Sequence, residues 1–376
     1  MRGINKVIVY FLLDFSDTWG RGGMLLFMSN IENDEYINKK VNDNRQYLNM
    51  MLKKQYNQEE IDRILAGYNV KRKVTIRVNT IKSNKNKIIE ELAKIGAEFD
   101  KVKWSENALI INNKSEKDLE DLDIYKNGEI YLQSLSSMLP PIVLNPQEKE
   151  DILDMTAAPG GKTTQIAALT NNNANITACE LNAIRAERLK FNVEKQGASS
   201  VFVMQKDSRN IDDYFSFDKI LLDAPCSGSG TLDFNDETTF KFFSQKLVEK
   251  SQKAQLTLLN KALKVLKPGK EMVYSTCSIL SCENEDIVNQ ALKLANAKIV
   301  PIEFEGMEDL PVLPTKIEGT ICVCPNEFFE GFFVAKIRKN WWRWIWYFFL
   351  WVRHLGTVFI CLIFETNKDR PQCLIL

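Results

Sequence analysis

The stretch Asp151-Ile-Leu-Asp-Met-Thr-Ala-Ala-Pro-Gly-Gly-Lys-Thr163 decides the fold class of this chain. Its first five residues are a short apolar run typical of a buried strand, and a glycine-rich turn and a helix are expected to follow. The turn is neither a Walker P-loop, which has the pattern GxxxxGKS or GxxxxGKT, nor a GxGxxG fingerprint. Taken alone, it fits a tight strand-to-helix turn as well as a loop that lets a ligand approach the backbone.

Further strands and helices alternate on the C-terminal side of this stretch. We expect strands at Ile176–Glu180, Val201–Asp207, Lys219–Asp223 and Glu271–Cys277, with the helix Asn182–Gln196 and a long helical stretch ending at Leu266 between them. Pro268-Gly269 is expected to turn the chain into the fifth strand, and later strands are expected at Ile299–Phe304 and Gly331–Ile337. This order predicts an α/β fold with a doubly wound, mostly parallel, Rossmann-like sheet.

The chain outside this region divides into three parts. Residues 43–130 combine helical and strand patterns and predict a small α+β domain, whereas residues 131–339 form the main domain. Residues 1–42 are an extension of uncertain structure without the features of a signal peptide. Residues 340–376 are an apolar, aromatic tail interrupted by Arg343, Arg353 and His354. The alternatives for the tail are an interfacial segment that contacts a membrane, a weak transmembrane helix and a non-native extension.

The composition excludes several kinds of chemistry. The 49 basic and 49 acidic residues balance, so any nucleic-acid surface must be a local concentration of charge. The single histidine, His354, disfavours Ser-His-Asp triads, Cys-His dyads and histidine-ligated zinc, and we expect no metal. The eight cysteines lack CxxC spacing, and Cys322 and Cys324 fit one strand better than a metal clip. A reducing, cytoplasmic compartment is expected, or the nucleus in a eukaryote.

Several polar residues stand where the predicted strands end, which is where open α/β sheets bind ligands. Glu180, Asp207 and Asp223 end three of the strands, and Cys226 and Cys277 follow or end two. Each has an ordinary alternative: an acid at a helix N-terminus is favoured by the dipole, and a buried cysteine is usually a small core residue. Two cysteines, an aspartate and Lys162 converging on one rim favour a reactive site instead.

Three of these segments together resemble a known family. Asp154–Thr163, Asp223–Gly230 and Ser275–Ser278, in this order, are similar to the RNA cytosine-C5 methyltransferases of the Sun/Nop/RsmB type. Arg77-Val-Asn-Thr80, Gln133-Ser-Leu-Ser-Ser137 and the segment 331–336 extend the resemblance, which covers about residues 43–339. The compact layout resembles the short archaeal-type tRNA methyltransferases most closely. Thr156 departs from the family, in which cysteine is common at this position, and a further RNA-binding domain is not evident.

The resemblance implies a role for each site residue. Cys277 would attack carbon 6 of cytosine, Cys226 would assist product release, and Asp223, with Lys162, would hold the base edge near N3 and N4. S-adenosylmethionine would be bound by Thr156, Ala157, Ala158, Pro159, Gly160, Gly161, Lys162, Glu180, Arg185, Asp207 and Asp223. Chemistry alone leaves the attacking cysteine open, because DNA cytosine methyltransferases use a Pro-Cys cysteine, which here is Cys226. A free thiol has a pKa near 8.5, so Cys277 would need a nearby positive charge, for which Lys162 is the candidate.

The RNA partner is expected to contact a basic run. Residues 69–87 include Lys71, Arg72, Lys73 and Arg77 and no acid, which is typical of a solvated face or, beside a methyltransferase domain, of phosphate contacts. We expect a monomer that methylates transfer RNA, with ribosomal RNA as the alternative. The competing hypotheses are a protein or small-molecule methyltransferase, an RNA-binding pseudoenzyme, and a membrane-bound interaction protein that would rest on the tail alone.

Overall fold

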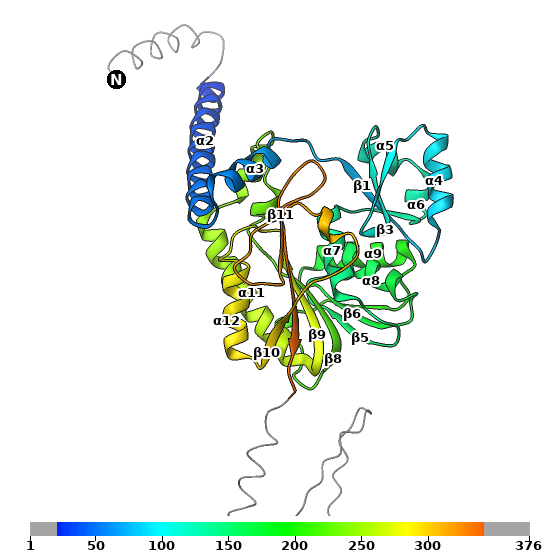
Figure 1. Ribbon diagram of the computed structural model, residues 1–376. Coiled ribbons are helices and arrows are strands. Elements are labelled where there is room, and N and C mark those ends of the chain that lie inside the picture. Colours follow the sequence, from blue (N-terminus) through cyan, green and yellow to red (C-terminus); the bar gives the residue numbers. More distant parts are fainter. Residues whose placement is uncertain (1–20, 342–376) are drawn as a thin grey trace, which may run out of the picture.

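The computed structural model of the chain describes residues 21–341, with side chains from residue 38 onward. The expectations for residues 1–20 and for the tail from residue 342 lie outside this range. Within residues 21–341, every helix is too short or too polar to cross a membrane. The described residues form two sheets, a large one of nine strands and a small one of four (Figure 1).

The large sheet is mostly parallel, as the sequence predicts. Its strands lie in the order β11-β12-β13-β9-β8-β5-β6-β7, and β10 pairs with β13. The pairs from β9 to β7 are parallel, whereas β13 runs antiparallel to β9. The bounds are β5 (Asp151–Asp154), β6 (Asn175–Cys179), β7 (Val201–Met204), β8 (Phe217–Asp223), β9 (Leu266–Thr276), β10 (Ala297–Val300), β11 (Val312–Leu313), β12 (Ile321–Val323) and β13 (Phe332–Lys339).

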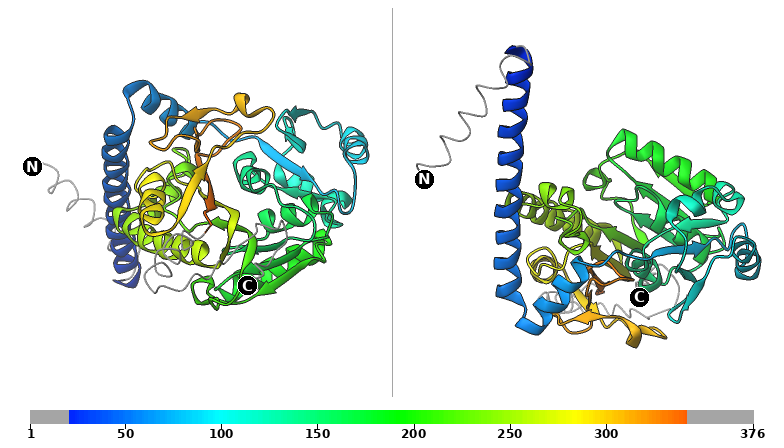
Figure 2. Two further views of the ribbon diagram at one scale, coloured as in Figure 1. Left: turned by 60° about the horizontal axis from the view of Figure 1, so that its bottom comes forward. Right: turned by 90° about the horizontal axis from the view of Figure 1, so that it is seen from above.

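Successive residues of the central strands point to opposite faces of this sheet, and helices cover both faces. In β8, Ile220 and Leu222 belong to one apolar core and Leu221 to the other. The first core also contains residues of α11 (Gln245–Val265) and α12 (Glu285–Leu294), and the second contains residues of α7 (Leu135–Leu144) and α8 (Gly161–Leu169). Leu189 of α9 (Ala183–Gln196) packs on Ala178 of β6. This arrangement confirms the doubly wound fold (Figure 2).

The expected small domain of residues 43–130 contributes side chains to two apolar cores. Leu48, Leu52 and Ile64, from α2 (Arg21–Gln55) and α3 (Gln58–Tyr68), are buried in the first core of the large sheet. A separate core belongs to the small sheet, whose strand order is β2-β3-β1-β4. The small sheet and its core begin at β1, whereas the apolar faces of α2 and α3 pack against the large sheet. The elements between residues 74 and 132 are β1 (Val74–Val78), α4 (Lys85–Lys94), β2 (Phe99–Val102), β3 (Ser105–Ile111), α5 (Glu116–Glu120), α6 (Asp123–Lys126) and β4 (Ile130–Leu132).

Two other segments differ from the sequence-based expectation. The long helical stretch before Leu266 is interrupted, since η2 (Ser229–Thr231) and α10 (Thr238–Phe242) precede α11. Strand β9 begins at Leu266, before the expected turn at Pro268-Gly269. Phe217 pairs with Leu266 and Lys219 with Glu271, so the turn is kept as a bulge inside the strand, with Gly269 at a φ of 80°. The remaining short helices are η1 (Ser208–Asn210) and η3 (Met307–Asp309).

Candidate active site

Several of the expected catalytic and cofactor residues lie at one rim of the large sheet, where β5, β6, β8 and β9 end. Asp154 ends β5, Glu180 directly follows β6, Asp223 ends β8, and Cys277 directly follows β9. The parallel register pairs Asp223 with Ser275, two residues before Cys277. The loop after β8 then returns Cys226 to the same place. These side chains meet because four neighbouring parallel strands end at one edge.

The two cysteines are in contact. Their Sγ atoms lie 3.0 Å apart, and both side chains are half-buried. Hydrogen bonding to Cys277 and burial raise the pKa of the Cys226 thiol well above its usual value. Cys226 therefore keeps its proton at neutral pH and can donate it toward the Cys277 sulfur.

An ion pair lies next to the sulfur atoms. Lys162 Nζ is 2.7 Å from Asp223 Oδ2, and the hydroxyl of Ser275 donates to Asp223 Oδ1 at 2.8 Å. Burial alone would lower the pKa of Lys162, but the charge and the hydrogen bond of Asp223, with a smaller contribution from Cys277, raise it. Lys162 is therefore a fixed positive charge beside the reactive thiol.

The glycine-rich turn is an open cradle between β5 and α8. Gly160 has a φ of 112°, and a Cβ atom there would lie 3.1 Å from Leu189. Among the described residues no side chain caps the N-terminus of α8, so its first N–H groups face the turn. Asp154 supports the turn from below by accepting the Thr163 hydroxyl at 2.7 Å and the Thr156 N–H. Such a turn can hold an anionic group of a ligand against the helix N-terminus.

The other expected cofactor residues surround this turn. Glu180 is buried and accepts the N–H of Asn182 at 2.8 Å. Arg185 lies 3.4 Å from Glu180 and donates to the carbonyl of Ala158 at 2.9 Å, so it holds the turn beside the second strand. Asp207 is paired with Arg209 at 2.6 Å, and the hydrogen bonds from Arg209 lower its pKa. Asp207 is thus on the rim, but its carboxylate already has a cationic partner.

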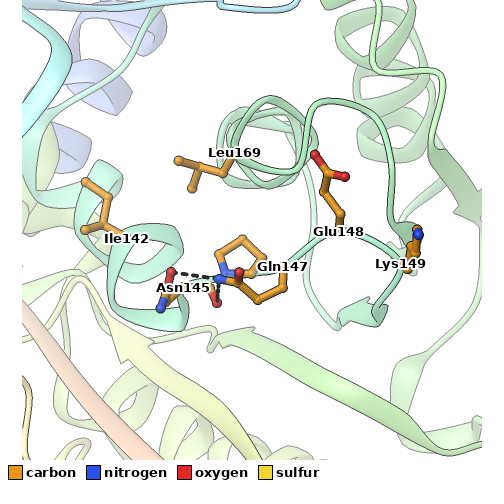
Figure 3. Close-up of a pocket in the computed structure, with 7 residues that line it drawn as sticks. Ile142, Asn145, Gln147, Glu148, Lys149 and Leu169 are labelled. Atoms are coloured by element: carbon orange, nitrogen blue, oxygen red, sulfur yellow. Dashed lines mark hydrogen bonds between the residues drawn. The ribbon is translucent and has the colours of Figure 1, made fainter.

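Two hollows of the surface lie away from this rim. One, of about 660 Å³, is lined by Ile142, Asn145, Leu169 and the segment before β5, at the opposite edge of the sheet (Figure 3). The other, of about 530 Å³, lies between the small domain and the end of α9, and Lys82, Lys126 and Lys195 line it. Both are separate from the cysteine pair.

Comparisons with known proteins identify the family. The family described as 16S rRNA methyltransferase RsmB/F matches residues 141–338, and the ferredoxin-like domain described for this family matches residues 46–116. The chain belongs to the RsmB/F methyltransferase family. The family uses S-adenosylmethionine, as the sequence-based resemblance implied. The uncapped helix, the glycine cradle and the buried Glu180 fit this cofactor.

Individual relatives agree with this assignment. Ribosomal RNA small subunit methyltransferase F of Shewanella loihica is 34% identical over 307 residues, which are 79% of this chain and 62% of that protein. The same enzyme of Aeromonas salmonicida is 36% identical over 278 residues, 71% of this chain and 57% of its own. The chain therefore spans less than two thirds of the length of these relatives.

Two solved structures share the fold. The structure of a methyltransferase homolog protein from Pyrococcus horikoshii is 31% identical, with a TM-score of 0.65, and the match covers 78% of this chain and 98% of that one. The structure of NSun6 from the same organism with SFG is 24% identical, with a TM-score of 0.68, over 79% of this chain and 97% of that one. The large parallel sheet is therefore the methyltransferase fold of the RsmB/F family.

The basic run of this RsmB/F chain is not a uniform surface. Lys71 is exposed and Lys73 half-buried, whereas Arg72 donates to the carbonyl of Leu232 at 3.2 Å. The expectation that Arg77 contacts phosphate is wrong, because only 3% of Arg77 is exposed. Its guanidinium donates to Gln133 Oε1 at 2.8 Å and to Thr164 Oγ1 at 2.9 Å, so it joins β1 to the start of α8.

Glu283 and Ser227 were not expected at the site. Glu283 is fully buried and accepts hydrogen bonds from Ser227, next to Cys226, and from Ser278, next to Cys277. The sequence contains one weak signal for it: an acidic residue that lies six positions after Cys277. In the described residues no group of acidic, histidine and cysteine side chains could hold a metal ion.

Proposed function

We propose that this chain methylates carbon 5 of cytosine in RNA, with S-adenosylmethionine as the methyl donor. The observation that carries this proposal is the pair of thiols, 3.0 Å apart, beside Lys162 and Asp223. Methyl transfer to nitrogen or oxygen needs no thiol, whereas cytosine C5 is too weak a nucleophile until a thiolate has added to C6. Covalent catalysis of this kind replaces one difficult step by two easier ones.

The environments of the two thiols support Cys277 as the nucleophile. Cys226 retains its proton because the hydrogen bond with Cys277 and burial raise its pKa. The positive charge of Lys162 lies close enough to Cys277 to interact with it electrostatically. The Sγ–C6 bond forms when the Cys277 thiolate attacks C6. It breaks after methylation, when a water molecule takes the proton from C5, the C5–H electron pair re-forms the C5=C6 double bond, and Cys277 departs as thiolate. Cys226 can then donate its own proton to the departing sulfur and regain one from solvent.

Asp223 and Lys162 would orient the base. Ser275 and Lys162 hold the Asp223 carboxylate in place, so it can accept a hydrogen bond from the N4 amino group of cytosine. The protonated Lys162 can donate toward N3, and a hydrogen bond at N3 makes C6 more electrophilic. The base must be unstacked to reach the rim, which costs a few kcal/mol.

The cofactor supplies an electrophilic methyl group next to C5 when it is bound. Thr156–Lys162 would surround its amino-acid portion, and the N–H groups of α8 would bind its carboxylate. Glu180 would accept the two ribose hydroxyls. Leu181, which follows Glu180 and is 60% exposed, offers an apolar surface for the adenine ring. This last residue was not among the sequence-based candidates.

The relatives support ribosomal RNA as the substrate. Those of Shewanella and Aeromonas are named for the small ribosomal subunit, which favours the ribosomal alternative over the transfer RNA expected from the compact layout. We therefore propose small-subunit ribosomal RNA. Of Lys71, Arg72, Lys73 and Arg77, Lys71 and Lys73 are the two proposed to contact phosphates.

Methyl transfer from labelled S-adenosylmethionine to small-subunit ribosomal RNA and to transfer RNA tests the proposal. Wild-type protein is expected to label cytosine in ribosomal RNA, and Cys277→Ala is expected to abolish labelling while cofactor binding survives. Cys226→Ala should instead trap a covalent RNA–protein adduct, seen as a retarded band on a denaturing gel. Turnover by Cys277→Ala would disprove the assignment. An adduct formed by Cys277→Ala would show that Cys226 is the nucleophile and that Cys277 assists release.

A further inference from the structure

The buried carboxylate of Glu283 lies between the two loops that carry the cysteines. Its Oε1 accepts the N–H of Ser227 at 2.8 Å, and its Oε2 accepts the hydroxyl of Ser227 at 2.5 Å and that of Ser278 at 2.6 Å. Ser227 directly follows Cys226, and Ser278 directly follows Cys277. One carboxylate is therefore connected to the immediate neighbour of each thiol.

When its carboxylate is ionised, Glu283 only accepts hydrogen bonds, and this sets the direction of the bonds around it. Burial raises the pKa of this carboxyl, and the hydrogen bonds from Ser227 and Ser278 oppose the shift. The Ser278 hydroxyl gives its single proton to Glu283, so the Ser229 hydroxyl must donate to Ser278 Oγ, 2.8 Å away. Ser229 Oγ in turn accepts the N–H of Ile279 at 3.0 Å, and Ser278 Oγ accepts the N–H of Leu280 at 3.1 Å. The ionised carboxylate thus fixes the direction of a chain that joins the loops after β8 and β9.

Glu283 is itself held in place from two sides. The hydroxyl of Tyr274 donates to its backbone carbonyl at 2.6 Å. Gln255 of α11 donates to the carbonyl of Pro225 at 2.9 Å and lies 3.4 Å from Glu283 Oε1. Because Glu283 is fixed relative to the sheet and to α11, it can hold both cysteine loops in fixed positions.

We propose that Glu283 is a positioning residue that holds the Cys226 thiol against Cys277 and thereby sets the rate of product release. The inference rests on the proposed function, because it assigns the thiol contact to the release step of the covalent reaction. Glu283 touches neither cysteine sulfur in this arrangement; it acts through Ser227 and Ser278.

The change Glu283→Gln tests the proposal with little change in shape. The amide nitrogen must face either the Ser227 N–H, which can only donate, or two hydroxyls whose protons point at it. The first arrangement leaves two donors in conflict, and the second forces the hydroxyl chain to reverse. In either case the Ser227 loop loses its fixed position, and with it the 3.0 Å contact between the sulfurs.

Turnover and adduct formation are measured for wild type, Glu283→Gln, Ser227→Ala and the control Glu285→Gln. Glu285 is 1% exposed, and its partner is the N–H of Lys316, outside both cysteine loops. We expect Glu283→Gln to lower kcat by about tenfold to a hundredfold, since displacement of a reacting group by about 1 Å can cost this much. KM for RNA should fall in parallel, so that kcat/KM stays within about twofold, because the slowed step follows formation of the covalent adduct, and this adduct should accumulate as in Cys226→Ala.

A double variant separates positioning from general loss of structure. Adding Glu283→Gln to Cys226→Ala should increase the adduct no further, because both changes impair the same contact. A folded Glu283→Gln with wild-type kcat, or with a lowered kcat but no adduct, overturns the proposal. If Glu283→Gln does not fold, Ser227→Ala decides by the same two readouts. Wild type without activity on any RNA would refute the proposed function itself, whereas active wild type with unaffected variants refutes the positioning role alone.

Discussion

At the scale of single residues, the rim of the sheet shows which site residues can be predicted from the sequence and which cannot. Asp154, Asp223 and Cys277 end or follow apolar strands, so the topology of a parallel sheet brings them together. Arg77 was misplaced because a run of basic residues does not indicate which of them points inward from a strand. Glu283 was missed because its role depends on Ser227, more than 50 positions away, and on Ser278, about five positions away. The sequence pattern of a single segment does not reveal such contacts.

Asp154 gives the protein a predictable pH dependence. Burial raises its pKa to about 6, against the opposing hydrogen bonds from Thr163 and Thr156. Because the folded state holds the proton more tightly than the unfolded chain, the folded protein loses stability as the pH rises from about 4 to about 6. Above this range the ionised carboxylate costs roughly 3 kcal/mol, because a pKa that differs by one between the folded and unfolded states corresponds to about 1.4 kcal/mol.

The variant Asp154→Asn should therefore gain stability relative to wild type as the pH rises. We expect the difference in unfolding free energy between variant and wild type to be about 2–3 kcal/mol more favourable at pH 8 than at pH 4. Urea denaturation at both pH values measures it, and any constant effect of the amide cancels in the comparison. Asp100→Asn, at an exposed position of β2, is the control. An equal difference at the two pH values would contradict the raised pKa.

At the scale of elements, the apolar runs predicted most of the central strands to within a few residues. Strand β8 ends at Asp223 as expected, because Ile220–Leu222 directly before it is an uninterrupted apolar run that is buried on both faces. The start of β9 was less predictable, since Pro268-Gly269 is an ordinary turn signal. Strand β8 pairs with Leu266 before the turn and with Glu271 after it, so the turn is kept within β9 as a bulge. Tertiary pairing thus outweighed a local signal.

Within the basic run, Arg77 has a structural role because it joins β1 to α8, whereas an exposed lysine can act through its charge. Arg77 is buried among three neutral acceptors, and burial lowers its pKa to about 10, so it stays charged at neutral pH. Arg77→Gln should lower the unfolding free energy by about 2–4 kcal/mol, because the acceptors in the joint are left unpaired. It should leave the salt dependence of RNA binding unchanged.

Lys71→Gln is the matched comparison for this prediction. An exposed lysine that contacts a phosphate releases one counterion, so its loss should reduce the slope of log K against log salt by about 1 while the melting temperature stays the same. Binding titrations at several salt concentrations and thermal denaturation of both variants provide the measurements. If folded Arg77→Gln also shows a reduced slope of log K against log salt, Arg77 contacts RNA and the structural interpretation is wrong.

At the scale of the whole molecule, helices far from the site in sequence support its loops. Tyr68 at the end of α3 donates to the carbonyl of Ser229 at 2.5 Å, and Tyr56 and Gln55 donate to the carbonyl of Ile279 at 2.7 and 2.9 Å. The small α+β domain expected for residues 43–130 includes α3 and the end of α2. Their side chains instead complete the methyltransferase core, which a helical pattern alone could not indicate because it does not specify the partner of its apolar face.

The two described residues beyond the expected boundary at residue 339 also contact the rest of the chain. Asn340 donates its N–H to the carbonyl of Asn296 at 2.8 Å, and Asn296 donates to the carbonyl of Trp341 at 3.0 Å. The ring of Trp341 lies over Gly269, where a Cβ atom would be 2.7 Å from it. The last contacts of the described chain with the sheet therefore include Trp341.

A chain truncated after Trp341 should retain full turnover per folded molecule, because every proposed catalytic and cofactor residue lies upstream. It should also be more soluble, since the removed segment contains Trp342, Trp344, Trp346 and Trp351, and apolar clusters promote association. A chain ending at Lys339 is the matched control: it loses the Trp341 contacts and should melt a few degrees lower, as expected for a loss of about 1 kcal/mol. Methyl-transfer rates, light scattering and thermal denaturation compare the three proteins. A truncated chain that folds and binds S-adenosylmethionine but does not methylate RNA would show that the tail contributes to the RNA site.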